Sequence, residues 1–493
     1  MRNFFTGRTE HVIKYLGTIM SGVYALFFGL LLLFLDYKLG NRIFFGSASL
    51  EIYQRLIPVV NVLVSIVIGI SLTTFSVIFV VMQLASSQFS PRILRHFLAN
   101  DLRVQHFIAL FVGTVALCIL PQLASVVYPN QPFLVTLVIG TFLALRALVW
   151  SYPSMITYLS VNMNISSITN QIKKEMVQEI HGLYREVWQK GGELLYKRQQ
   201  ATSTAKVFSI VSPFESGYLE SVNYVKLEQL LEVIFKKYGV HAVYQKPVVG
   251  EYIMKETSVL LMVEAVAFSE DLKKELERLV EVTFLVNVFR SHTQDINFGV
   301  RKLVDIAIKA ISPAVNDPTT CLNCIDQIGE ILKHLSDRQF PSSEARHLMH
   351  KNIHINEFNY DEFVDFCFDQ IFQWGKNDPT VIKRILRTLR LIVPTVENPF
   401  HLKVLLQEVE DMDLLSIYNF ENKEGNFSKE KILTIRKELK GFQLKALSQI
   451  AHLKEKGILH YYIQEHLCCN NEITLVQKET LDFLAMYNIN EAF

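Results

Sequence analysis

The sequence predicts a membrane α-helical protein in which about four transmembrane helices precede a soluble α+β domain. Three observations support this fold class. Four strongly apolar segments lie within residues 1–160. That region contains ten Lys or Arg and four Asp or Glu, whereas the remainder contains 39 and 44. Residues 205–290 are rich in β-branched and aromatic residues, which favours strands. The soluble domain is therefore expected to combine a small β-rich module with a helical C-terminal part.

The four apolar segments lie near residues 17–35, 57–85, 107–127 and 133–152. A helix crosses the hydrocarbon core of a bilayer with about 20 mostly apolar residues. No small-residue cleavage site follows the first segment, which favours a retained helix over a signal peptide. Residues 1–160 are therefore predicted to form a transmembrane domain.

The basic residues of the loops predict the orientation of these helices. Three arginines lie in the 86–104 loop, and the 128–132 loop has no charge. The positive-inside rule then places the N-terminus and the 86–104 loop in the cytoplasm. The 36–56 loop has three basic residues as well and weighs against this assignment. Four crossings would return the chain to its starting side, so both termini are predicted to be cytoplasmic.

Small and polar residues form a stripe on one face of the second predicted helix. They recur at steps of three or four residues: Asn61, Ser65, Gly69, Thr73, Ser76, Gln83 and Ser87. Such a stripe is typical of close packing between membrane helices. The alternative is that it lines a water-filled path between subunits, with Gln83 near the cytoplasmic mouth.

Arg146 lies inside the fourth apolar segment. Charged side chains in spanning helices usually face the protein interior or a cavity. Arg146 is also close enough to the predicted end of the helix to reach the headgroups with its side chain. Both interpretations stay open.

The remaining chain divides into four predicted regions. These are a helical connector at 161–204, the β-rich module at 205–290, a helix–turn–helix segment at 291–335 and the helical part at 336–493. Helix-like stretches near 225–238 and 269–288 interrupt the β-rich module.

The densest polar motif lies in the helix–turn–helix segment, with Gln294, Asp295, Arg301, Asp305, Asn316 and Asp317. Arg301 and Asp305 have the spacing of a helical ion pair. Asn316 and Asp317 favour a turn that caps the following helix. This structural interpretation is the favoured one, and the alternative is a polar subunit contact or ligand site.

No sequence motif indicates a metal, a cofactor or a catalytic residue. Cys321 and Cys324 form a CxxC, but no second ligand pair follows at zinc spacing. His347, His350 and His354 would share one face of a helix, and we interpret them as a solvated surface rather than a metal site. Neither the basic nor the acidic part of the chain has the charge of a nucleic-acid-binding domain.

Two long phrases resemble the predicted membrane protein family called domain of unknown function 2254. They are TTFSVIFVVMQLASSQFSPRIL at 73–94 and RSHTQDINFGVRKLVDIAIKAISPAVNDPTT within 290–330. The likeness covers most of the chain through about residue 400. It implies a multi-pass protein of the bacterial inner (plasma) membrane and supplies no biochemical activity. The family often carries paired histidines after the fourth helix, which residues 151–159 lack.

The leading functional interpretation is an oligomeric ion channel or passive transporter with a cytoplasmic regulatory domain. Four helices are few for a monomeric carrier, so a pore would be shared between subunits of a homo-oligomer. The alternative is a membrane-anchored sensor or scaffold that binds an unidentified ligand or partner through its cytoplasmic domain. An enzyme using Asp295, Asp305 and Asp317 is the weakest interpretation, because no nucleophile or metal motif accompanies them. The lipid bilayer is the remaining expected partner.

Overall fold

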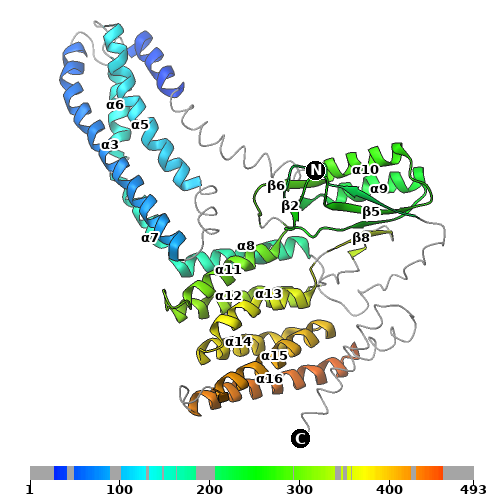
Figure 1. Cartoon of the computed structure of the whole chain (residues 1–493). Coiled ribbons are helices and arrows are strands. Elements are labelled where there is room, and N and C mark those ends of the chain that lie inside the picture. Colours follow the sequence, from blue (N-terminus) through cyan, green and yellow to red (C-terminus); the bar gives the residue numbers. More distant parts are fainter. Residues whose placement is uncertain are drawn as a thin grey trace. The chain divides into compact units, whose positions relative to one another are not determined.

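Figure 1 shows a computed structural model of the chain, which divides into two compact units, Met1–Ile168 and Thr169–Phe493. The structure describes residues 27–40, 49–88, 102–128, 133–146, 149–150, 152–162, 164–184, 206–291, 294–338, 346–347, 352–356, 358–422 and 429–458.

The first unit is helical. Residues 27–35 form a helix that continues into a π-helical turn, η1 (Asp36–Gly40). The longer helices are α3 (Ser49–Gln88), α5 (Leu102–Val127), α6 (Leu134–Arg146) and α7 (Tyr152–Asn162). Apolar side chains from α3, α5 and α6 bury one another in a common core. The buried Asp36 carboxylate accepts hydrogen bonds from Thr136 N (2.9 Å) and Thr136 Oγ1 (3.1 Å), which ties η1 to the start of α6.

Among the described residues, two helices are long and apolar enough to cross a membrane, at Glu51–Val77 and Leu110–Val127. They match the second and third predicted segments, so the prediction of about four spans is not confirmed. Within the fourth segment, 13 residues are described as the apolar helix α6, and residues 147–148 and 151 lie outside the described part of the chain. Residues 17–26 of the first segment lie outside the described part of the chain.

The second unit contains the β-rich module, which has two sheets. The first has the order β1 (Lys206–Val211), β5 (Val259–Ala265), β3 (Val240–Gln245), β8 (Ile353–Ile355) and β7 (Arg346–His347). The second has the order β4 (Tyr252–Ile253), β2 (Gly217–Val222) and β6 (Phe284–Asn287). Helices α9 (Tyr224–Tyr238) and α10 (Glu270–Thr283) correspond to the two helix-like stretches predicted within the module.

Strands β7 and β8 lie where the sequence analysis placed helix. His347 and His354 are opposite each other in the β7–β8 register, so they do not share a helical face. Ile353 and Ile355 are buried on either side of His354, and this alternation is the period-two signal of a strand. The stretch is short, and β8 is held by parallel pairing to β3, about 110 residues earlier in the chain.

The rest of the second unit is a stack of helices (Figure 1). Its members are α8 (Ile165–Leu183), α11 (Ile296–Ala310), α12 (Pro318–Ser336), α13 (Tyr360–Gly375), α14 (Pro379–Ile392), η4 (Val393–Thr395), α15 (Pro399–Asn422) and α16 (Lys429–Glu455). Helix α13 packs on both α11 and α15, and α14 packs on both α12 and α16. Helices α11 to α16 therefore form three successive pairs arranged in two layers, one of α11, α13 and α15 and the other of α12, α14 and α16.

Local sequence signals explain where these helices begin. Asp295, Asp317 and Asp378 each accept a hydrogen bond from a backbone N–H in the first turn of α11, α12 and α14. Proline follows directly at the first position of α12 and α14, where its missing N–H costs nothing. Asn359 and Glu362 form a reciprocal capping box at the start of α13.

Candidate functional site

The stripe on α3 is the first candidate site. Asn61, Ser65, Gly69, Thr73, Ser76 and Gln83 are all exposed, and the side chain of Ser87 lies outside the described set. The buried residues of α3 include Val60, Val64 and Val67, which pack within the first unit. At 100° per residue, the stripe is centred roughly opposite these buried residues on the helix. It therefore faces away from the other described helices of the first unit.

The hydroxyl groups of the stripe are satisfied within α3. Ser65 donates to Asn61 O (2.8 Å), Thr73 donates to Gly69 O (2.9 Å), and Ser76 donates to Leu72 O (2.9 Å). Nothing lies within 4 Å of the position that a Cβ of Gly69 would take. The Asn61 amide is exposed and has no hydrogen-bond partner among the described residues.

Arg146 is the last residue of α6, and it is exposed. Its side chain is not buried among the described residues of the first unit, and residues 147–148 lie outside the described part of the chain. No described carboxylate forms an ion pair with it.

The six polar residues of the helix–turn–helix segment are distributed over three places. Gln294 and Asp295 precede α11, Arg301 and Asp305 form an ion pair of 2.8 Å within it, and Asn316 and Asp317 follow it. Helix α11 has 15 residues, which separates its two ends by about 22 Å. Both turns also require unusual backbone: Gln294 has φ +60° and Asn316 has φ +50°.

The start of α11 is the second candidate site. The Asp295 side chain is 3 % exposed and bonds the Arg290 guanidinium through both oxygens, at 2.6 and 3.2 Å. It also accepts from Phe298 N at 3.0 Å and so caps α11. Burial raises the pKa of Asp295, while Arg290 and the capping N–H oppose that change. One carboxylate thus serves as helix cap and ion-pair partner at once.

Gly250 is the point at which the β-rich module meets this carboxylate. Its φ is +93°, a conformation that favours glycine, and a Cβ here would overlap Asp295 Oδ2. Gln294 makes a second junction, because its Oε1 accepts from Val222 N (2.9 Å) and its Nε2 donates to Val222 O (3.2 Å). The side chain of Gln294 therefore pairs with the end of β2 as a neighbouring strand would.

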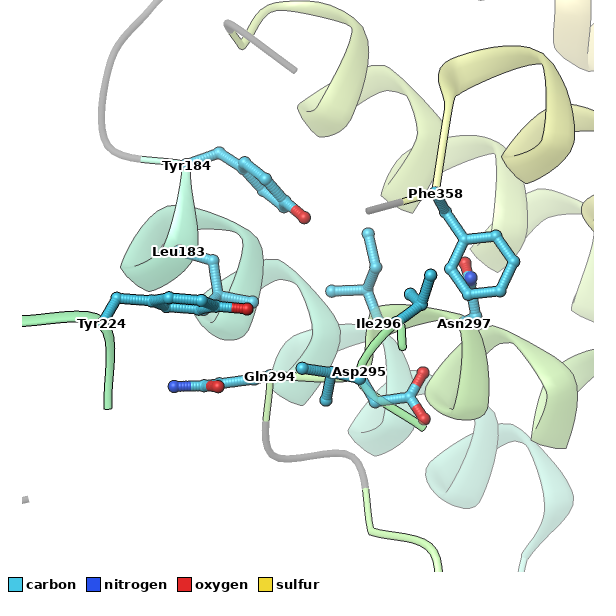
Figure 2. Close-up of a pocket in the computed structure, with 10 residues that line it drawn as sticks. Leu183, Tyr184, Tyr224, Gln294, Asp295, Ile296, Asn297 and Phe358 are labelled. Carbon is cyan, nitrogen blue, oxygen red and sulfur yellow. The ribbon is translucent and has the colours of Figure 1, made fainter. Parts of the chain in front are cut away.

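A cavity of about 30 Å³ lies at these junctions. Figure 2 shows Tyr184, Tyr224 and Phe358 around it. Asn297 also lines it, is 3 % exposed, and has no hydrogen-bond partner for its Oδ1 among the described residues. A cavity needs about 10–15 Å³ to hold one water, whereas pockets for organic ligands measure about 300–1,000 Å³. The dimensions and the unpaired oxygen suit one or two bound waters.

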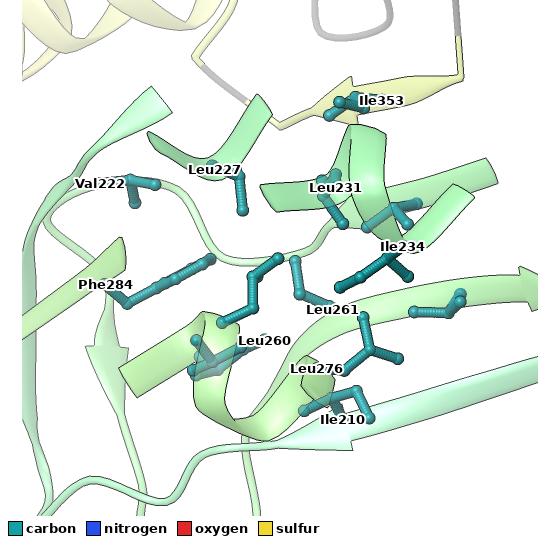
Figure 3. Packing of buried hydrophobic residues seen from close by; sticks show 14 of the residues in the cluster. Ile210, Val222, Leu227, Leu231, Ile234, Leu260, Leu261, Leu276, Phe284 and Ile353 are labelled. Carbon is teal, nitrogen blue, oxygen red and sulfur yellow. The ribbon is translucent and has the colours of Figure 1, made fainter. Parts of the chain in front are cut away.

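The module side of the cavity belongs to a packed core (Figure 3). Val249, which lines the cavity, is buried in the same cluster as Ile253 and Leu260. Leu227 and Leu231 of α9 and Leu276 of α10 pack into this cluster from the helices. The core therefore fixes the loop that carries Gly250 against Asp295.

Two groups near this site, the buried Lys302 and the partly exposed Arg290, have no counterpart in the sequence interpretation. Lys302 is 4 % exposed, and burial lowers its pKa against the opposing influence of Glu175 and Asp295. Its Nζ lies 5.2 Å from the centre of the Phe298 ring. The signal for Arg290 was its spacing of five residues from Asp295, but only tertiary structure shows that Asp295 and Lys302 are buried.

The three aspartates of the motif each have a partner in the described structure. Asp295 is paired with Arg290, Asp305 with Arg301, and Asp317 caps α12 through Thr320. No group of three or more metal-ligating side chains occurs among the described residues. Cys321 and Cys324 are buried and unpaired, and burial raises the pKa of Cys321 to about 12. These groups stabilise structure in the geometry observed.

Comparisons with known proteins identify relatives. The chain is 24 % identical over 340 residues to an uncharacterized protein of Mycobacterium bovis and, at the same identity, to uncharacterized proteins of two Mycobacterium tuberculosis strains. Each match covers 66 % of this chain and 61 % of the relative, so the chain spans less than two thirds of their length. No solved structure matches. The model of a family described as predicted membrane protein, DUF2254, matches residues 16–391, about three quarters of the sequence, and the chain therefore belongs to that family.

Proposed function

We propose that the protein is a homo-oligomeric channel or passive transporter in which the α3 stripe of several copies lines or borders the conduction path. The observation that carries the proposal is the direction of the stripe. It lies on the side of α3 opposite the buried valines, and its described residues are exposed.

Asn61 supplies the energetic argument. It lies ten residues inside the candidate span Glu51–Val77, about 15 Å from the beginning of that span. An amide facing hydrocarbon without a hydrogen-bond partner costs roughly several kcal/mol. A second copy of the chain, or water between copies, removes that cost. The hydroxyl groups do not discriminate between these environments, because α3 already satisfies them.

The second unit fits a regulatory or assembling part on the cytoplasmic side. The cavity at the start of α11 is too small for an organic ligand, so it favours assembly over small-molecule sensing. A membrane-anchored scaffold is the alternative function, because the charged helical stack offers surfaces for a protein partner.

Conductance of the full-length protein in planar bilayers tests the proposal. Ser76→Leu and Gln83→Leu place apolar bulk on the stripe, and we expect each to change unitary conductance roughly twofold or more. Val77→Leu is the matched control, since Val77 is the next residue after Ser76 and is exposed on another side of α3. Unchanged currents in both stripe variants would remove the stripe from the path. A silent bilayer containing folded, inserted protein would favour the scaffold.

A further inference from the structure

The last two helical pairs carry opposite charge on their two layers. Helix α13 has four acidic and no basic residues, and α15 has five acidic and one basic. Helix α14 has four basic and no acidic residues, and α16 has seven basic and three acidic. With every carboxylate counted as ionised, the α13/α15 side, called the acidic layer below, therefore has a formal net charge of −8, and the α14/α16 side, the basic layer, has +8.

The acidic layer is not neutralised within the chain. Asp361, Asp365 and Asp369 are exposed at intervals of four residues along α13, and Asp411 is exposed on α15. None of these four forms an ion pair with any residue that the structure describes. Partial burial, reinforced by the neighbouring carboxylates, raises the pKa of Asp365 and Asp369.

A buried carboxylate lies beneath this surface. Glu408 of α15 is 7 % exposed and has no hydrogen-bond partner among the described residues. Burial, followed by the charges of Asp369, Asp365 and Asp411, raises its pKa to about 8. The acidic layer thus has an excess of negative charge that a cationic partner would relieve.

The basic layer has the matching excess. Arg384 is paired with Asp326 at 3.1 Å, and Arg390 with Glu438 at 2.8 Å. The basic residues of this layer without an ion pair in the described part of the chain include Lys383, Arg387, Lys437, Lys440, Lys445 and Lys454. Leu391 on α14, with Leu433 and Leu444 on α16, adds exposed apolar area to this layer.

We propose that the acidic layer of one copy binds the basic layer of the next copy. This inference rests on the proposed homo-oligomer. Because the two layers are different surfaces of one chain, the contact is heterologous, and it closes into a ring where the rotation between successive copies allows closure. Anionic lipid is the rival occupant of the basic layer, but it would leave the acidic layer uncompensated.

Charge reversal on each layer tests this contact in the full-length protein. Asp365→Lys with Asp369→Lys reverses the acidic layer, and Lys383→Glu with Arg387→Glu reverses the basic layer. The oligomer distribution is measured in nanodiscs by mass photometry at low and high salt. Each pair is expected to weaken association at least about tenfold, because like charges then face each other. The four substitutions together restore complementarity and should return association to near the wild-type value.

The control is Glu277→Lys with Glu281→Lys on α10, which makes the same charge change away from both layers and should leave association unchanged. A wild-type oligomer that none of the reversals weakens would overturn the contact while leaving the proposed homo-oligomer intact. A monomeric wild-type protein would overturn both. If only the basic-layer pair has an effect, and that effect follows the anionic lipid content of the nanodisc, the basic layer binds headgroups and the proposal is wrong.

Discussion

Replacing Glu408 by glutamine should stabilise the second unit at alkaline pH. The native pKa of Glu408 is about 8, against 4.5 for an unperturbed glutamate. The native state therefore binds more protons than the unfolded chain between these values, and the associated stability falls as pH rises. This contribution of Glu408 to stability is fully present below pH ~4.5 and is lost as pH rises through ~8. At 1.36 kcal/mol per pKa unit, the difference between the native pKa of about 8 and the unperturbed pKa of 4.5 corresponds to about 5 kcal/mol of unfolding free energy.

Glutamine has nearly the shape of a protonated glutamate and never ionises. Glu408→Gln should therefore match the wild type near pH 5 and exceed it in stability by several kcal/mol near pH 9, on the order of the full difference. The assay is hydrogen exchange of α13 and α15 in the detergent-solubilised full-length protein, corrected for intrinsic exchange at each pH. Glu410→Gln, on the exposed side of the same helix, is the control. The reasoning would be refuted if the opening free energy of α13 and α15 changed with pH in the same way in the wild type and in Glu408→Gln.

Three further predictions concern the helical stack. Asp295→Asn weakens the Arg290 ion pair but keeps a good N-cap, whereas Asp295→Ala removes both. The opening free energy of α11, measured by hydrogen exchange, should therefore fall by about 1 kcal/mol less in Asp295→Asn than in Asp295→Ala. Equal losses in the two variants would contradict the dual function of this carboxylate. Gly299→Ala should destabilise the α8–α11 contact by about 1–3 kcal/mol, since a Cβ there overlaps Met176 Sδ, and an unchanged melting temperature would oppose it. Cys324, whose pKa burial raises well above its usual value, should resist iodoacetamide until the protein is denatured; rapid native labelling would contradict its burial.

The sequence predicted elements whose signals are local. The cap at Asp317 follows from short-range side-chain chemistry. The Arg301–Asp305 ion pair follows from helical spacing. The candidate span at Glu51–Val77 follows from length and hydropathy. Each of these signals lies within a stretch of sequence no longer than one helix.

Arrangements that depend on distant residues were not predictable in the same way. Strand β8 needs β3 as its partner, and an isolated three-residue strand has no stability of its own. The contact between Gly250 and Asp295 joins residues 45 positions apart. Spacing alone made the six polar residues from Gln294 to Asp317 look like one cluster, because it did not include the length of α11 between them.

The layered charge was visible in the sequence only as alternating acidic and basic helices. Alternating charge along a chain usually indicates a solvated surface. The pairing of α13 with α15 and of α14 with α16 converts that alternation into two separated surfaces of opposite sign. We expect a contact between copies because the packing of the helices separates the charges onto two surfaces. The composition alone does not predict that separation.

The buried Glu408 links this contact to pH. Its carboxylate faces Asp365 and Asp369 from α13 and Asp411 from its own helix. Basic residues of a neighbouring copy would favour its ionised form, so docking should release a proton. By linkage, association should then strengthen as pH rises from about 6 to about 9. Glu408→Gln should remove that part of the dependence, measured by mass photometry of nanodisc-embedded protein across this range. An equal pH dependence in Glu408→Gln and wild type would show that Glu408 is not coupled to docking, whatever holds the copies together.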